Sequence, residues 1–245
     1  MGGGDTPFIK PNVSHCIQEN DVHYNPIINH AYVDLGLPSG TLWATMNVGA
    51  NSETDYGLYF AWGDTQGYAD ASTKEFSWSD YKFNPSGDGS TFTKYNTTDG
   101  LTVLDIEDDA ARANWGGDWH MPTEEQCEEL FNTTYITNEW VTDYNNSGIN
   151  GCLFTSVSNG NTLFIPAAGW CYNGNSRREY GKIADCWTKV RSSNEDDFAV
   201  RFGADNRGNT YTLNYQRFGG YPVRGVITPT VTPTPIEEPI IVPAR

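Results

Sequence analysis

Short segments in which every second residue is apolar constrain the fold of this chain more than any other feature. Residues 42–48, 56–62, 198–203 and 211–215 show this alternation, and residues 163–165 form a short apolar run. A period of two predicts β-strands with one face on a core, whereas an amphipathic helix needs a period near 3.6. The chain also has 25 glycines and 13 prolines, which favour turns. We therefore expect short antiparallel strands joined by long loops.

Two short helices are expected among these strands. Residues 105–114 carry acids at the N-terminal end, where the helix dipole favours them, and Gly116 follows as a stop signal. A second helix is expected after Pro122, because Thr123 and Gln126 have the spacing of a capping box. Helices grouped among antiparallel strands predict the α+β class rather than a parallel sheet.

The chain divides into three parts by its pattern. Residues 30–226 carry the alternating segments and are expected to form one domain. Residues 1–29 show no clear period and are expected to be an extended arm, serving either as a loose terminus or as a docking segment. They lack the basic and apolar regions of a signal peptide, which leaves either a shortened chain or another route out of the cell. Alternating Thr and Pro in residues 227–245 predict an extended, polyproline-like tail.

The charge of the chain excludes one class of partner. The formal net charge is −16, and the sequence contains no run of Lys and Arg. Nucleic-acid binding draws most of its affinity from cationic contacts to phosphate, so we expect no nucleic-acid partner. The sequence also contains no apolar stretch long enough for a membrane span, so none is expected.

The cysteines do not indicate a disulfide framework. There are 5 of them, at positions 16, 127, 152, 171 and 186, and none has C-x-x-C spacing. An odd number cannot be fully paired within one chain. Buried free thiols are the favoured interpretation, with a Cys171–Cys186 disulfide as the alternative.

Separated motifs resemble one known family in the right order along the chain. They are VDLGLPSGTLWATMNVG at 33–49, YGLYFAWGD at 56–64, EDDAARANWGGDWHMP at 107–122, IPAAGW at 165–170 and FGGYPVRGV at 218–226. Together they resemble the Fibrobacter succinogenes major paralogous domain, which is found widely in gut bacteria and belongs to the C-type-lectin-like superfamily. The arm and the tail lie outside the resemblance.

The resemblance implies a C-type-lectin-like fold with a ligand face. The first and last strands would lie near each other, with both ends leaving from one side and long loops and a small sheet on the opposite side. Residues 187–217 match the segment that carries this face, and related phage and bacterial diversity-generating proteins have their mutable binding residues there. His120, Met46 and the lack of a Ser-Ser-Thr run after Trp187 depart from the family pattern and leave the ligand open.

The composition of this segment supports recognition rather than chemistry. Tyr, Trp and Arg dominate binding hot spots, with Asn and Gly as adaptable partners. The candidate ligand-binding residues are Trp187, Arg191, Asn194, Asp205, Asn206, Arg207, Asn209, Tyr211, Tyr215 and Arg217. Trp170 and Tyr172 add aromatic surface just before it, although Trp170 and Trp187 also suit a core. Residues 205–211 form a turn-rich stretch that we expect to be exposed.

No catalytic, metal or cofactor site is predicted. The Glu-Pro-Asn, Gln-Pro-Asp and Trp-Asn-Asp triplets of calcium-dependent sugar-binding lectins are absent, and the acidic stretch 194–197 is interpreted as a solvated loop. The carboxylates at 107–109 are explained by their place at a helix start. Cys171 and Cys186 do not resemble the paired cysteines of the related formylglycine-generating enzymes. We therefore expect no enzymatic activity.

These observations predict a ligand- or receptor-binding module. The favoured setting is a phage particle or surface appendage, where residues 1–29 would anchor the domain to a virion, an appendage or a second copy. The ligand would be a glycan or a protein on the surface of a host cell. The alternative is an exported bacterial cell-surface binding protein or adhesin, with the Thr-Pro tail as a linker. The expected location is accordingly the virion or the extracellular cell surface.

Overall fold

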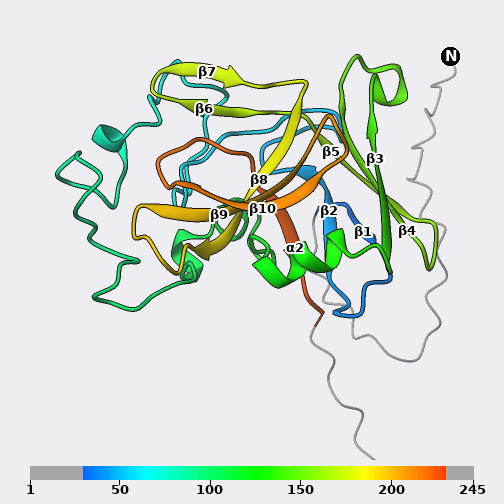
Figure 1. Ribbon diagram of the computed structural model, residues 1–245, viewed down its shortest axis with the longest axis horizontal. Coiled ribbons are helices and arrows are strands. Elements are labelled where there is room, and N and C mark those ends of the chain that lie inside the picture. The colour runs from blue at the N-terminus through cyan, green and yellow to red at the C-terminus, as the bar shows by residue number, and fades with distance from the viewer. Residues whose placement is uncertain (1–29, 230–245) are drawn as a thin grey trace, which may run out of the picture. The chain divides into compact units, whose positions relative to one another are not determined.

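The computed structural model describes residues 30–229, and the predicted arm and nearly all of the predicted tail lie outside this range (Figure 1). The strands are β1 (Tyr32–Asp34), β2 (Leu42–Asn47), β3 (Ile136–Val141), β4 (Gly151–Ser156), β5 (Thr162–Pro166), β6 (Trp170–Tyr172), β7 (Asn175–Arg178), β8 (Ile183–Arg191), β9 (Phe198–Asp205), β10 (Thr210–Gln216) and β11 (Arg224–Ile227). The helices are α1 (Ala110–Trp115) and α2 (Glu124–Phe131), with 3-10 turns η1 (Trp78–Asp80), η2 (Ile106–Asp108) and η3 (Tyr144–Asn146). The predicted α+β class is confirmed.

The strands form four antiparallel sheets. Their orders are β1-β2-β11, β10-β9-β8, β3-β4-β5 and β6-β7. Strands β1 and β11 flank β2 instead of pairing with each other, and both run antiparallel to it. They are therefore parallel to each other, with Tyr32 of β1 opposite Ala44 and Ile227 of β11 opposite Leu42. The first and last strands thus lie near each other in one sheet, on either side of β2.

The local signals for the helices are confirmed with one change. At α2, the Thr123 hydroxyl accepts a hydrogen bond from the Gln126 backbone, and the Gln126 side chain reaches back to the Thr123 backbone. The expected helix over 105–114 is divided into η2 and α1. The break lies at Asp109, which has extended backbone angles because its carboxylate caps α1 and also accepts the Met121 N–H at 2.8 Å. Helix α1 ends at Gly116, whose φ of 70° favours glycine.

The alternating segments are mostly strands, but two expectations are wrong. Residues 56–62 make only isolated pairings, Tyr59 with Tyr68 and Phe60 with Tyr221. Strands β7 and β8 lie within residues 175–191, where the sequence pattern predicted no strand. Strand β8 is buried on both faces over much of its length. A strand of this kind does not alternate in sequence, so the period of two cannot reveal it.

The core is largely aromatic, and a long irregular segment supplies much of it. Residues 63–104 contain only η1 as regular structure, but Phe76, Tyr81, Phe83 and Tyr95 from this segment are buried in the main cluster. The cysteines at 127, 152, 171 and 186 are free and buried, and Cys16 lies outside the described residues. None of the helices in residues 30–229 is long and apolar enough to cross a membrane.

Candidate ligand-binding face

Three of the predicted ligand residues belong to the interior. Trp187 on β8 is fully buried, its indole N–H donates to the Phe60 carbonyl at 2.9 Å, and its ring packs edge-on against Tyr221. Arg191 is 4% exposed and donates to the Leu101 carbonyl and to the Asp196 carboxylate. These contacts explain the burial: both side chains join β8 to segments distant in sequence. They therefore offer no surface to a ligand, contrary to the prediction.

Arg217 is the third buried residue, and its hydrogen bonds hold the irregular segment 63–104 to the core. Its guanidinium donates to the Tyr81 hydroxyl at 2.9 Å and to the backbone carbonyls of Lys94, Tyr95 and Asp196 at 2.7–3.1 Å. The rings of Trp62, Tyr81, Phe83 and Phe92 surround it, with guanidinium-to-centroid distances of 4.7–5.7 Å. The side chain is fully buried and binds the protein itself rather than a ligand.

The turn between β9 and β10 is exposed, as predicted for its central residues. The Asp205 carboxylate accepts the backbone N–H groups of Arg207 and Asn209 at 2.9 and 3.1 Å. Asp205 is half-buried and shapes the turn, while Asn206, Arg207 and Asn209 are exposed. Asn194, in the loop after β8, is exposed as well. The turn thus presents polar groups, but its own residues already satisfy part of their hydrogen-bonding capacity.

Tyr211 and Tyr215 lie on one face of the β8–β9–β10 sheet. Leu213 lies between them on the same face and is 47% exposed. In the register of the sheet, Leu213 is opposite Arg201 of β9. Gly203 of β9 is opposite both Tyr211 and Asp185 of β8. Because side chains at opposed positions share a face, Asp185 and Arg201 project to the same side as the tyrosines.

An ion pair lies under this face and orients it. Arg201 Nη1 donates to one Asp185 oxygen, and the Tyr211 hydroxyl donates to the other at 2.9 Å. The Arg201 guanidinium lies 5.4–5.7 Å from the ring centroids of Tyr211, Tyr215 and Tyr221. Burial raises the pKa of Asp185 to about 6, although the neighbouring guanidinium opposes this shift. The Asp185–Arg201 pair therefore fixes the position of the Tyr211 side chain through the hydrogen bond to Asp185.

Three polar atoms in and beside this cluster have no hydrogen-bond partner within the described residues. They are Arg201 Nε, the Tyr221 hydroxyl and Nε1 of Trp170, whose ring packs on Tyr221, and all three are shielded from solvent. A buried donor without a partner typically costs about 1–3 kcal/mol. Unsatisfied donors in a folded protein are uncommon, and here they lie close together beneath a partly exposed aromatic surface.

The β6–β7 hairpin extends the surface. Trp170 stacks on Tyr221 with ring centroids 6.0 Å apart, and Tyr172 lies edge-on to Tyr215 at 6.4 Å. The exposed Arg178 lies over the Tyr172 ring. We call the following residues the aromatic face: Trp170, Tyr172, Arg201, Tyr211, Leu213 and Tyr215. Sequence reasoning missed Arg201 and Asp185; the alternation of 198–203 places Arg201 opposite the apolar set and was the available signal.

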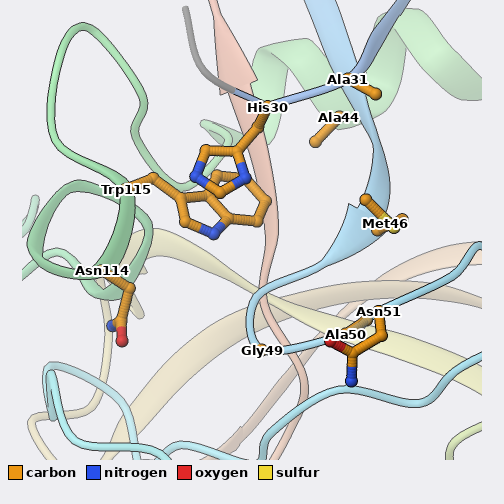
Figure 2. Close-up of a pocket in the computed structure, with 9 residues that line it drawn as sticks. All are labelled: His30, Ala31, Ala44, Met46, Gly49, Ala50, Asn51, Asn114 and Trp115. Carbon is orange, nitrogen blue, oxygen red and sulfur yellow. The ribbon is translucent and has the colours of Figure 1, made fainter. Parts of the chain in front are cut away.

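A separate small pocket lies between β2 and the C-terminal end of α1 (Figure 2). It has a volume of about 280 Å³ and is lined by His30, Ala31, Ala44, Met46, Gly49, Ala50, Asn51, Asn114 and Trp115. The His30 imidazole stacks on the Trp115 ring at 4.4 Å, and burial lowers its pKa. The lining contains no carboxylate, thiol or hydroxyl, so the pocket lacks an acid–base pair and a nucleophile. None of the predicted ligand residues lines it.

Acidic groups are engaged by the protein's own cations. Asp105, Glu107 and Asp108 lie close enough to share a cation, but Lys94 Nζ is 2.7 Å from Asp105 and from Asp108. In the loop 194–197, Asp196 pairs with Arg191 and accepts the Thr97 N–H at 3.0 Å. Both groups are explained by these ion pairs and hydrogen bonds.

Comparison of the chain with protein-family models, with curated proteins and with solved structures yields no significant match in any of the three.

Proposed function

We propose that this chain is a non-catalytic ligand-binding domain of the C-type-lectin-like class, which binds its ligand through the aromatic face. The observation that carries the proposal is the partly exposed set of aromatic side chains over β8–β9–β10, held from below by the Asp185–Arg201 pair. The family resemblance of the sequence motifs supports the same class and the same segment of the chain.

The chemistry of the face suits recognition of a host-cell glycan or protein. Tyr and Trp supply large contact areas and lose few rotameric states on binding. Aromatic rings and Arg also dominate the central residues of protein interfaces. Leu213 provides exposed apolar area between the two tyrosines of β10. A preorganised surface of this kind binds without first ordering its side chains, which lowers the cost of association.

A binding role also accounts for the titratable groups near the face better than catalysis does. Asp185, Arg201 and Tyr211 are engaged with one another rather than directed at an open cavity. A hydrolytic site needs two placed carboxylates or a nucleophile with a base, and the aromatic face as defined contains neither.

The setting we propose is display on a phage particle or a surface appendage, with an exported bacterial binding protein as the alternative. Display in many copies would raise avidity without any new contact in the domain. Immunogold labelling of purified particles and of whole cells separates these settings, because each places the chain on a different object.

A binding experiment with a matched pair of variants tests the proposal. The full chain would be applied to a glycan array and to a panel of gut-bacterial cells. Leu213→Ser removes exposed apolar area from the aromatic face, and Val157→Ser does the same on β4's connecting turn, where Val157 is 58% exposed. We expect saturable binding that falls at least about fivefold in Leu213→Ser and is unchanged in Val157→Ser. Equal losses in both variants, or no binding by the parent, would overturn the proposed face.

A further inference from the structure

The outer edge of β10 is a free strand edge. Strand β10 pairs with β9 only. The hydrogen bonds Asp205 N–H to Asn209 O and Arg217 N–H to Asp197 O lie at the two ends of this ladder. Because antiparallel pairs alternate, Thr210, Thr212 and Asn214 direct their N–H and C=O groups away from β9. These groups form the unpaired edge.

The opposite edge of the same sheet, strand β8, is covered by other segments of the chain. On β8, the N–H groups of Trp187, Lys189 and Arg191 donate to the carbonyls of Pro222, Pro122 and Thr102. Strand β10 receives no such cover from the rest of the described chain. It also lacks the features that usually prevent strand pairing, since its sequence TYTLNYQ has no charge and no proline and its register with β9 is uninterrupted.

Unpaired carboxylates lie beside this edge. Helix α2 packs against β10 (Figure 1). The Glu124 side chain hydrogen-bonds with Thr212. Burial raises the pKa of Glu124, and the neighbouring Glu128 and Glu125 raise it further. None of these carboxylates forms an ion pair with a cation of residues 30–229. The edge of β10 therefore has an aromatic surface on one side and uncompensated negative charge on the other.

We propose that β10 binds an extended cationic segment of another polypeptide by strand addition. The backbone of the segment would pair with Thr210, Thr212 and Asn214. Its alternate side chains would be apolar over Leu213 and cationic beside Glu124 and Glu128. A second copy of this chain fits less well, because two antiparallel β10 strands would bring the acidic helices of both copies together, and each copy has a net charge of −16. The site uses backbone groups of the edge and adjoins the aromatic face, with which it shares Leu213.

Fluorescence anisotropy with short labelled peptides tests this proposal on the full chain. The probe is an octapeptide of alternating Lys and Val, and the control peptide alternates Glu and Val. We expect the Lys-Val peptide to bind, with an affinity that falls as salt rises, and the Glu-Val peptide to bind at least about tenfold more weakly. Equal binding of both peptides, or binding of neither, would overturn the proposal.

Two variants separate the backbone and charge contributions. Thr212→Pro removes an outward N–H and places a ring on the edge, while leaving the β9 ladder bonds in place, so it should lower affinity at least about tenfold. Glu124→Gln with Glu128→Gln should lower it about fivefold, whereas Glu53→Gln with Glu139→Gln, at exposed positions elsewhere, should not change it. If Thr212→Pro fails to melt cooperatively, the charge variants still decide, and unchanged affinity in Glu124→Gln/Glu128→Gln contradicts the proposal. A parent dimer that Thr212→Pro converts to monomer would show a second copy on the edge instead.

Discussion

Two arginines, Arg201 on β9 and Arg217 directly after β10, differ in how fully the protein satisfies their hydrogen-bond donors. Arg217 donates to the Tyr81 hydroxyl and to backbone carbonyls, and its side chain is fully buried among aromatic rings. Arg201 pairs with the Asp185 carboxylate, keeps an unpartnered Nε, and lies under side chains that reach the surface. Both arginines contact several aromatic rings, so ring contacts alone do not distinguish them.

The difference separates an arginine that holds the core together from one that lies beneath the proposed binding surface. A guanidinium whose donors meet carbonyl oxygens from a distant segment holds that segment to the core. A guanidinium that pairs with a carboxylate of raised pKa orients the side chains above it. One of its N–H donors still has no hydrogen-bond partner. In the sequence each arginine directly precedes a phenylalanine, so only the partners found in the structure distinguish their roles.

The largest effect is expected at Arg217. Arg217→Met keeps the apolar volume but leaves the carbonyls of Lys94, Tyr95 and Asp196 without their donor. We expect a loss of roughly 3–5 kcal/mol in the free energy of unfolding, measured by urea titration. Arg207→Met, at an exposed position, should change it by less than about 0.5 kcal/mol. A loss below about 1 kcal/mol in Arg217→Met would show that aromatic packing alone holds residues 63–104.

The Asp185 centre should make stability depend on pH, and Asp185→Asn should remove this dependence. Because the folded-state pKa of Asp185 is raised to about 6 from an ordinary value of 3.8, the folded protein binds a proton that the unfolded chain has released between these values. The resulting stabilisation is present below about pH 4 and is lost as pH rises through 6. It amounts to roughly 3 kcal/mol. Urea titrations from pH 4 to 7 should show a fall for the parent that is absent in Asp185→Asn; parallel curves would contradict the raised pKa.

Two Tyr→Phe variants near Arg201 compare a hydroxyl that is hydrogen-bonded, that of Tyr211, with one that has no partner, that of Tyr221. Tyr211→Phe removes a hydrogen bond to a carboxylate and should cost roughly 1.5–3 kcal/mol. Tyr221→Phe removes a buried hydroxyl that has no partner, so stability should stay within about 0.5 kcal/mol or rise. Thermal melts of the two variants side by side would measure this difference. Equal losses would mean that the Tyr221 hydroxyl is hydrogen-bonded in solution.

The smallest effect is expected at the β9–β10 turn. Asn206 and Arg207 are exposed, so the double change to Ala should leave the melting temperature unchanged. We expect less than about a threefold loss of ligand binding, because the central contacts of an interface carry most of its energy. A larger loss, in a variant that melts like the parent, would extend the binding site from the aromatic face to the turn.

Sequence reasoning succeeded where a signal is local. The capping box at Thr123 and the strands β2, β9 and β10 could be predicted, because caps and alternation depend on neighbours a few residues away. It failed at β8, which is buried on both faces and carries no alternation. It also failed at residues 56–62, where the alternating pattern is present but the segment pairs only at single residues.

For the candidate site, the sequence alone determined which residue types are present and that residues 187–217 contain most of them. The tertiary structure decided which of them face solvent. Trp187 and Arg217 are interior because Phe60, Tyr81 and Tyr95, all distant in sequence, bring their backbone or hydroxyl oxygens to them. Tyr211 and Tyr215 stay partly exposed because β10 is the edge strand of its sheet and pairs with β9 only. Burial of a polar or aromatic side chain depends on such long-range contacts, which composition and spacing do not encode.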